Sequence, residues 1–104
     1  MSDYALADSV VGELDEIWGY IAKDNPEAAI QVVEAVYETF QRLANHPGLG
    51  RPHHSPHPEI QGLRFRPVWG YTRYLVLYRE ILGGIEILHV YHDARNISAL
   101  LKRR

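Results

Sequence analysis

The chain has 104 residues, of which 46% are hydrophobic and 23% are charged, and it contains no cysteine. These proportions are typical of a globular protein, and the missing thiols exclude disulfides, thiolate zinc sites and a cysteine nucleophile. The length fits a single domain over residues 1–104. No apolar run approaches the roughly 20 residues that a membrane helix needs, so we expect a soluble, cytoplasmic protein with no membrane partner.

The formal net charge of −2 conceals a strong asymmetry between the two halves of the chain. Residues 1–47 hold nine acidic and two basic side chains, whereas residues 48–104 hold four acidic and nine basic ones. A basic half favours an acidic partner, either nucleic acid or an acidic peptide. A merely solvated surface is the alternative interpretation of the same numbers.

The first half of the chain predicts a short strand and two helices. Residues 2–7 fit an edge strand, and Asp8 is the expected N-cap of the helix that follows. Asn25 and Pro26 are typical of the cap and first position of a second helix, which must stop before Pro47. Both helices carry an apolar stripe, and so short a connection makes them an antiparallel hairpin. The stripes consist of Val10, Leu14, Ile17 and Ile21, and of Ala29, Val32, Val33, Val36, Phe40 and Leu43.

The second half predicts a long loop followed by a sheet. Prolines are concentrated here, so residues 46–62 form one loop, of a length that is often functional. Three strands joined by short turns follow, and they make an antiparallel meander. The helical hairpin would cover one face of this meander, which is an α+β fold. The expected strands are residues 63–68, 71–80 and 85–91, and the turns are Trp69-Gly70 and Gly83-Gly84.

Alternation within these strands predicts a cluster of arginines. Arg64 and Arg66 share one face of the first strand, Arg73 and Arg79 share one face of the second, and Arg95 follows the third. If neighbouring strands align, these guanidinium groups converge on one side of the sheet. Guanidinium groups bind carboxylates and phosphates through two hydrogen bonds, so this surface suits an acidic peptide or a nucleic-acid backbone. The alternative is that the arginines only solvate the edge of the sheet.

Three histidines of the proline-rich loop are candidate metal ligands. His53, His54 and His57 lie close together in sequence, and a metal site would need a further ligand such as Glu59 or His46. An exposed loop that happens to hold histidines is the simpler interpretation. We therefore expect no metal and no cofactor.

Two more histidines stand near the end of the last strand. His89 and His92 straddle its two faces, and alternation places Ile85, Ile87, His89 and Tyr91 together on one of them. An imidazole at this place can act as a general acid or base. No serine and no pair of carboxylates lies nearby in sequence to complete a nucleophilic triad, so packing and hydrogen bonding explain these histidines equally well.

Segments along nearly the whole chain carry a further signal. These segments are residues 4–7, 14–22, 24–29, 47–51, 62–64, 74–78 and 85–95, together with Phe40, Leu43 and Ala44. Taken in order, they resemble toxins of the RelE/ParE superfamily from type II toxin–antitoxin systems. The resemblance implies an N-terminal strand, an antiparallel helical hairpin and a mainly antiparallel sheet. It also implies a cognate, ParD-like antitoxin that wraps over the toxin and neutralises it.

Departures from the RelE-like pattern bear on the activity that the resemblance implies. RelE-like members cut messenger RNA on the ribosome and usually carry a basic residue after the first tyrosine of a Tyr-x-x-x-Tyr strand, where this chain has Leu75. They also tend to end with a catalytic tyrosine or histidine, which residues 97–104 lack. A ribonuclease would have only Arg95, His92 and Arg73 to recruit, which leaves its catalytic set incomplete.

The ParE-like branch is therefore the better match. Its members are thought to inhibit DNA gyrase by binding, without chemistry of their own, so no catalytic residue and no stable direct binding to DNA by the toxin alone are expected. The alternatives are a RelE-like endonuclease, a related protein with another target or lost activity, and an unrelated small binding protein. On charge grounds the residues expected to bind the target or the antitoxin are Arg64, Arg66, Arg73, Arg95, Lys102, Arg103 and Arg104.

Overall fold

The computed structural model describes residues 3–52 and 62–92, and its elements confirm the expected α+β order. Two helices follow a short first strand, and the remaining strands follow the helices. Two very short elements, a 3-10 turn and strand β2, lie in the segment that was expected to be an irregular loop. In chain order the elements are β1 (Asp3–Leu6), α1 (Asp8–Ala22), α2 (Pro26–Asn45), η1 (Pro47–Leu49), β2 (Arg51–Pro52), β3 (Leu63–Val68), β4 (Tyr71–Ile81) and β5 (Gly84–His92).

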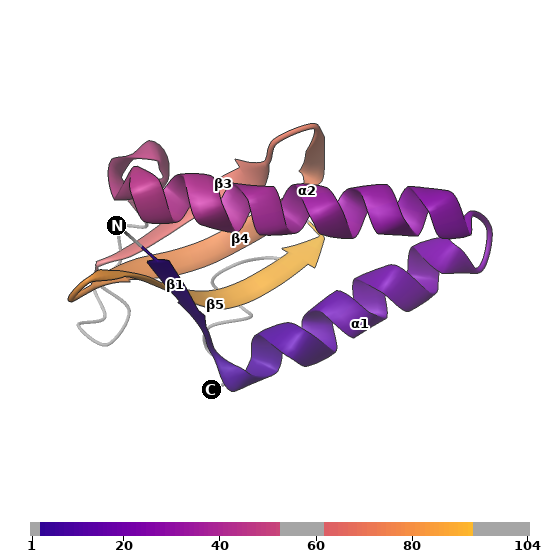
Figure 1. Cartoon of the computed structure of the whole chain (residues 1–104), viewed down its shortest axis with the longest axis horizontal. Helices are drawn as coiled ribbons and strands as arrows, with labels where there is room; N and C mark the ends of the chain where they lie inside the picture. The colour runs from indigo at the N-terminus through magenta and orange to yellow at the C-terminus, as the bar shows by residue number, and fades with distance from the viewer. Residues whose placement is uncertain (1–2, 53–61, 93–104) are drawn as a thin grey trace.

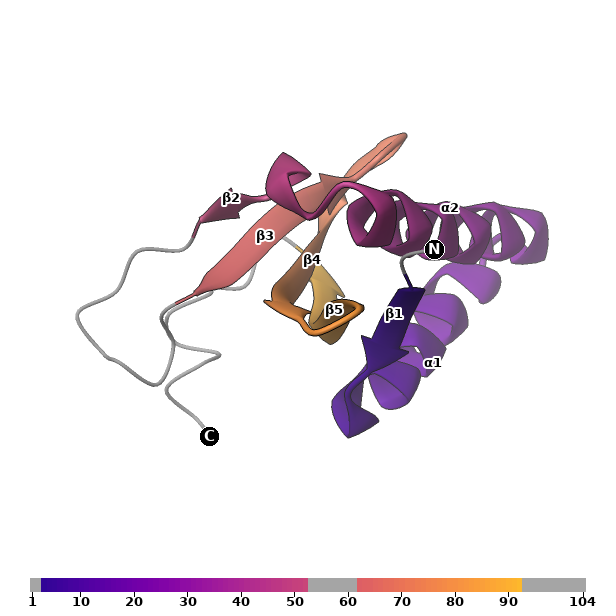
Figure 2. The same ribbon diagram turned by 60° about the vertical axis from the view of Figure 1, so that its left-hand side comes forward.

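The strands form one sheet in the order β1-β5-β4-β3-β2. β3, β4 and β5 make the predicted antiparallel meander, β1 pairs in parallel with β5, and β2 pairs with β3 at the opposite edge. The helices lie on one side of the sheet (Figure 2). They diverge from their connecting loop, and β5 points into the wedge between them (Figure 1).

The two helices begin differently. At α2 the prediction is confirmed, because the Asn25 side chain accepts a hydrogen bond from the Ala28 N–H at 3.1 Å and Pro26 occupies the first position. At α1 the predicted N-cap is wrong, since the cap is Ala7 and no side chain caps the helix. The Ala7 N–H still donates to the Ile87 carbonyl as part of the sheet, and its own carbonyl accepts the first helical bond. Asp8 instead lies in the first turn, where its charge complements the helix dipole.

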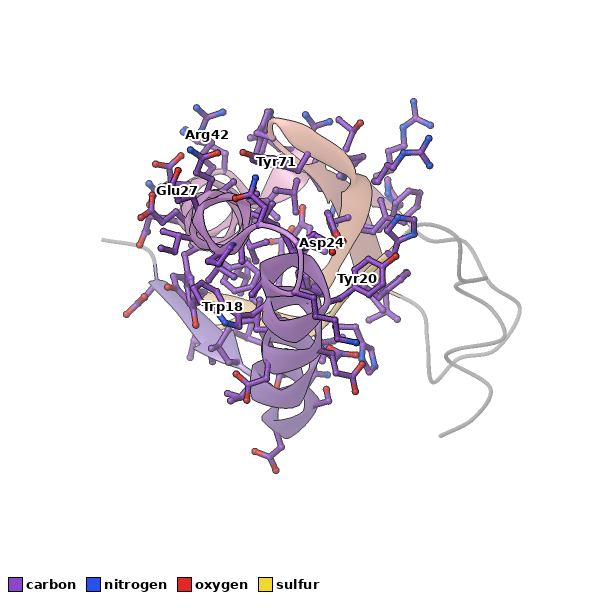
Figure 3. All side chains as sticks on the ribbon, turned by 90° about the vertical axis from the view of Figure 1, so that its right-hand side faces the viewer. Trp18, Tyr20, Asp24, Glu27, Arg42 and Tyr71 are labelled. Atoms are coloured by element: carbon purple, nitrogen blue, oxygen red, sulfur yellow. The ribbon has the colours of Figure 1, made fainter. Side chains whose placement is uncertain are left out.

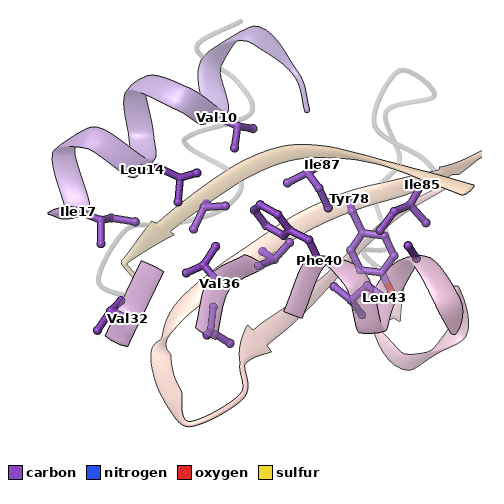
Figure 4. Packing of buried hydrophobic residues seen from close by; sticks show 14 residues of the cluster. Val10, Leu14, Ile17, Val32, Val36, Phe40, Leu43, Tyr78, Ile85 and Ile87 are labelled. Carbon is purple, nitrogen blue, oxygen red and sulfur yellow. The ribbon is translucent and has the colours of Figure 1, made fainter. Parts of the chain in front are cut away.

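The main core lies between the helices and the sheet. Figure 4 shows the apolar stripes of α1 and α2 meeting side chains from β4 and β5. Phe40 and Tyr78 are among its largest fully buried side chains. Burial of a large apolar side chain stabilises a fold by about 1.5–3 kcal/mol relative to exposure. The hairpin and sheet are therefore held together chiefly by this layer.

An extra residue, Leu88, changes the faces of β5, because the pairing with β4 shifts by one at this point. Ile85 and Ile87, which precede it, pack in the helix-side core, whereas Tyr91, which follows it, joins a second cluster on the opposite face. Such a bulge reverses the alternation of side chains beyond it. The expectation that Ile85, Ile87, His89 and Tyr91 share one face is therefore wrong.

The arginines of β3 and β4 also lie on different faces. Arg64 pairs with Tyr78, a residue of the helix-side core, so Arg64 and Arg66 belong to the helix-covered face. Arg73 and Arg79 alternate with Tyr78 along β4 and belong to the opposite face. Directly paired residues of neighbouring strands point to the same side of a sheet. Arg64 and Arg66 pair with Tyr78 and Val76 of β4, and not with its arginines. The expected convergence of these guanidinium groups on one side is therefore wrong.

Candidate functional site

α1 completes the edge of β5 where β1 ends. The Ser9 hydroxyl donates to the Leu88 carbonyl at 3.0 Å, and one carboxylate oxygen of Glu13 accepts from the Val90 N–H at 3.0 Å. The other oxygen of Glu13 lies 2.8 Å from Nδ1 of His89. Helical side chains thus satisfy backbone groups that an open strand edge would leave unpaired. His89, only 8% exposed, has a structural role in this contact.

A hollow of about 340 Å³ lies beside this contact, between α1 and the neighbouring parts of β4 and β5. Its lining combines two carboxylates, three tyrosines, one histidine and two aliphatic side chains. Tyr20 projects from α1 on the side of the hollow, whereas Trp18 projects on the other side of the helix (Figure 3). The lining residues are Glu13, Glu16, Ile17, Tyr20, Tyr74, Val90, Tyr91 and His92.

Two of the tyrosines in the hollow have perturbed acidities. Burial, and to a lesser extent the charge of Glu13, raises the pKa of Tyr91 to about 12. Burial, followed by the neighbouring Tyr20, also raises the pKa of Tyr74. Both phenols are therefore neutral at physiological pH. The Tyr91 side chain is 2% exposed, and its hydroxyl has no hydrogen-bond partner among the described residues.

His92 forms one wall of the hollow and packs edge-on against Tyr74. The two ring centroids are 5.4 Å apart, with an angle of 90° between the ring planes. His92 and Tyr74 are also paired residues of β5 and β4, so the sheet itself holds this aromatic contact in place. His92, one of the two general acid–base candidates of the sequence, is thus half-buried at the hollow.

Tyr78 and Arg64 anchor the segment that follows α2. The Tyr78 hydroxyl donates to the Pro47 carbonyl at 2.6 Å and accepts from the Gly50 N–H at 2.8 Å. Nη1 of Arg64 donates to the Gly50 carbonyl at 2.8 Å, and its Nε lies 3.7 Å from a carboxylate oxygen of Glu80. A Cβ atom at Gly50 would overlap the ring and hydroxyl of Tyr78. Arg64 therefore contributes to the structure, whatever else it binds.

Arg42 and Arg66 share one aromatic ring near the C-terminal end of α2. Their guanidinium carbons lie 4.9 and 4.4 Å from the ring centroid of Trp69. The backbone N–H of Trp69 donates to the Thr39 hydroxyl at 3.3 Å. Nε of Arg66 is buried without a hydrogen-bond partner in the part of the chain that the structure describes. The arrangement concentrates positive charge at the negative end of the helix dipole.

The face of the sheet opposite the helices is largely apolar in the described residues. Leu75, at the position where RelE-like members carry a basic residue, packs there against a second buried cluster. Arg73 is exposed on the same side of β4. Arg79 forms an ion pair with Glu86 at 2.8 Å. The buried residues of this second cluster are Leu63, Leu77, Leu88 and Tyr91.

Several expected site residues lie outside the described ranges. They include the loop histidines and most of the basic C-terminal candidates. Within residues 3–52 and 62–92, no group of three histidine, aspartate or glutamate side chains lies close enough to hold a metal ion. None of the helices in those ranges is long and apolar enough to cross a membrane. The residues outside are His53, His54, His57, Glu59, Arg95, Lys102, Arg103 and Arg104.

The helical hairpin exposes several large apolar side chains. Val11 and Trp18 are two turns apart on α1, and Ile30 and Tyr37 are two turns apart on α2. Tyr37 packs on Phe40 with ring centroids 5.5 Å apart. Exposed apolar side chains in regular register are typical of an interaction surface.

The hollow and the Glu13–His89 contact were not predicted from the sequence. A signal was present, because Glu13, Ile17 and Tyr20 follow each other at spacings of four and three and so share one side of a helix. The partners of this side could not be identified, since they lie on β5, and Glu13 and His89 are 76 positions apart.

The family model for the ParE toxin of type II toxin–antitoxin systems, parDE, matches residues 4–97. This chain belongs to the ParE toxin family. The predicted RelE/ParE superfamily membership is thereby confirmed. The expected type II toxin–antitoxin system is confirmed with it.

Individual relatives agree with the family assignment. The ParE-family chain is 30% identical to toxin ParE1 of Caulobacter vibrioides, over 97% of its own length and 99% of the relative's. It is 39% identical to Y4kP of Sinorhizobium fredii, over 76% of this chain and 75% of that one. A structure of the chromosomal ParDE toxin–antitoxin system from P. aeruginosa shares the fold, with a TM-score of 0.69 at 22% identity, and the match covers 88% of this chain and 96% of that one.

Proposed function

We propose that this ParE-family toxin acts by binding DNA gyrase and that a cognate, ParD-like antitoxin neutralises it. The observation that carries the first part is the apolar face of the sheet around Leu75. Cleavage of RNA without a metal requires cationic groups and an acid–base pair around the transferred phosphate. On this face, the described residues supply buried leucines, with the exposed Arg73 and the Arg79–Glu86 ion pair beside them. That composition supports inhibition by binding over cleavage.

The exposed apolar residues of the hairpin support the second part of the proposal. Trp18 and Tyr37 stand on the two helices, and Tyr4 of the adjacent edge strand packs on the same Phe40 as Tyr37, with ring centroids 5.3 Å apart. An antitoxin segment bound here would remove several apolar side chains from water. The P. aeruginosa structure with the same fold belongs to a ParDE system, which supports such a partner for the present chain.

The arginines fall into separate groups as candidate contacts for gyrase or the antitoxin. Arg66 and Arg73 are the described candidates whose guanidinium groups have no carboxylate partner among the described residues. Arg64 is already engaged with Gly50 and Glu80. We therefore propose Arg66 and Arg73 ahead of Arg64, together with the basic residues after β5, which are Arg95, Lys102, Arg103 and Arg104.

Controlled expression in a bacterial host tests this function. Growth, a DNA-damage reporter and transcript integrity are followed together, and purified protein is added to a gyrase supercoiling assay. Growth arrest with reporter induction, intact transcripts and inhibited supercoiling is the expected result. Rapid transcript cleavage would instead assign the chain to the RelE-like endonucleases, and absence of arrest with folded protein present would reject toxin action.

Two further arms sharpen this experiment. His92→Ala should leave the arrest in place if the toxin acts by binding, whereas an endonuclease that uses this imidazole would lose it. Co-expression with the adjacent gene should restore growth and yield a stable complex. Failure of every neighbouring small reading frame to do so would reject the antitoxin part.

A further inference from the structure

The hollow between α1 and β5 has the size and lining of a receptor for one long side chain. Its volume of about 340 Å³ is at the lower end of the range of small-ligand pockets, about 300–1,000 Å³. Tyr20, 76% exposed, stands at its margin, and the nearly buried Tyr91 borders its interior. Tyr74 and His92 hold the opposite wall through their edge-on contact. The sheet and α1 thus form this cavity without help from a partner.

Among the described residues, the lining of the hollow is negatively charged. Glu13 and Glu16 both line it, and the positive side chains of the described chain lie elsewhere. Glu13 is engaged with His89 and the Val90 N–H, but Glu16 is exposed and forms no ion pair with any described residue. A carboxylate or phosphate would be repelled here. An apolar group would remove Glu16 from water without giving it a partner.

The aromatic lining favours a planar cation. Tyr20 and Tyr74 place aromatic rings beside the two carboxylates, and a guanidinium group stacks on such rings more readily than an ammonium group does. The buried Tyr91 hydroxyl lacks a hydrogen-bond partner within the described chain. An arginine has five N–H donors, so it can pair with a carboxylate and still donate to a hydroxyl group.

We propose that this hollow binds an arginine side chain of a protein partner. For the identity of that partner, the cognate antitoxin, the inference rests on the proposed function. The arginine stacks on the tyrosine rings, forms an ion pair with Glu16 and supplies the hydrogen bond that Tyr91 lacks. The hollow therefore provides a specific anchor for a partner segment, separate from the apolar surface of the hairpin.

The test uses the isotope-labelled full chain and NMR titration with N-acetyl-arginine amide, with N-acetyl-citrulline amide as the uncharged match. Arginine amide should produce saturable shifts at Val90, Tyr91 and His92, and citrulline amide should not. Glu16→Gln should weaken binding about tenfold, the size of one charge-assisted hydrogen bond. Asp15→Asn changes an exposed residue outside the hollow and should leave the binding of arginine amide unchanged. Tyr91→Phe should weaken binding without lowering the melting temperature, because its hydroxyl is unpaired.

Three results would overturn the proposal. The first is the absence of saturable shifts, and the second is equal binding of the arginine and citrulline amides. The third is binding that emerges only when Arg95, Lys102, Arg103 and Arg104 are all replaced by glutamine, which would assign the hollow to the chain's own C-terminal segment. Because the titration needs neither gyrase nor toxicity, its failure is distinguishable from a failure of the proposed function.

Discussion

Glu13 and His89 connect the first helix to the last strand, with 2.8 Å between the Glu13 carboxylate and Nδ1 of His89. The second oxygen of Glu13 accepts from the Val90 N–H, so one side chain satisfies two groups of β5. Both partners of the pair are largely buried. The carboxylate therefore replaces the backbone acceptors that a longer β1 would have supplied.

Removing this carboxylate should destabilise the fold. Glu13→Ala leaves the Val90 N–H and the His89 imidazole without their partner, so we expect the free energy of unfolding to fall by about 1–3 kcal/mol. Urea denaturation followed by circular dichroism measures the change. Asp15→Ala, an exposed position on the same helix, is the matched control and should change stability by no more than about 0.5 kcal/mol. Equal effects at the two positions would contradict the structural role of Glu13.

The Tyr78 hydroxyl should stabilise the connection after α2. Tyr78→Phe removes both hydrogen bonds to Pro47 and Gly50 and leaves two backbone groups unpaired, at a cost of about 1–3 kcal/mol. Tyr20→Phe, which removes an exposed hydroxyl, should be close to neutral. Hydrogen exchange at the Gly50 amide provides a local readout, and it should accelerate more in Tyr78→Phe than global stability alone explains. Unchanged exchange would mean that other contacts hold this segment.

Gly84 should be irreplaceable where β1 meets β5. A Cβ atom at this position would overlap the Asp3 carbonyl, so Gly84→Ala should separate the start of β1 from the sheet and lower the melting temperature. Gly12→Ala is the matched control, because nothing lies within 4 Å of its Cβ position in α1. There the substitution should stabilise the protein by about 0.5–1 kcal/mol through the higher helix propensity of alanine. Stabilisation at both positions would contradict the close β1–β5 approach.

Stability should decline in alkaline solution because of Tyr91. Its pKa is raised from 10.0 to about 12 in the folded protein, so above pH 10 the unfolded chain loses this proton while the folded chain retains it. The unfolded state then binds fewer protons, and stability falls as the pH rises from 10 towards 12. Denaturation midpoints measured across this interval test the effect. Tyr91→Phe should make the loss of stability between pH 10 and 12 less steep. An unchanged slope of stability against pH would contradict the role of Tyr91 in this loss.

Local signals in the sequence were sufficient for the longer elements but not for η1 and β2. The Asn25-Pro26 pair placed the start of α2, and the alternation after Gly62 placed β3 and β4 almost to the residue. The start of α1 was less accurate, since Ala7 remains part of the sheet ladder while capping the helix. A residue shared by two elements has no distinct local pattern.

The candidate site was less accessible to sequence reasoning than the fold. Arg64 and Arg66 were correctly placed on one face, but their position relative to Arg73 and Arg79 depends on the pairing of β3 with β4. The hollow was missed because its residues come from α1, β4 and β5. Their proximity is a property of the packed layers.

The sequence by itself determined the order of the main elements and the α+β class, because turns, caps and apolar periodicity are set by neighbouring residues. The resemblance of its segments to known toxins indicated the family. Only the tertiary structure decided which side chains meet. The extra residue at Leu88 shifts Tyr91 to the other face of the sheet, and the wedge between the helices brings Glu13 to the edge of β5. Strand register and helix placement depend on burying the core as a whole, so contacts between distant residues cannot be derived from either segment alone.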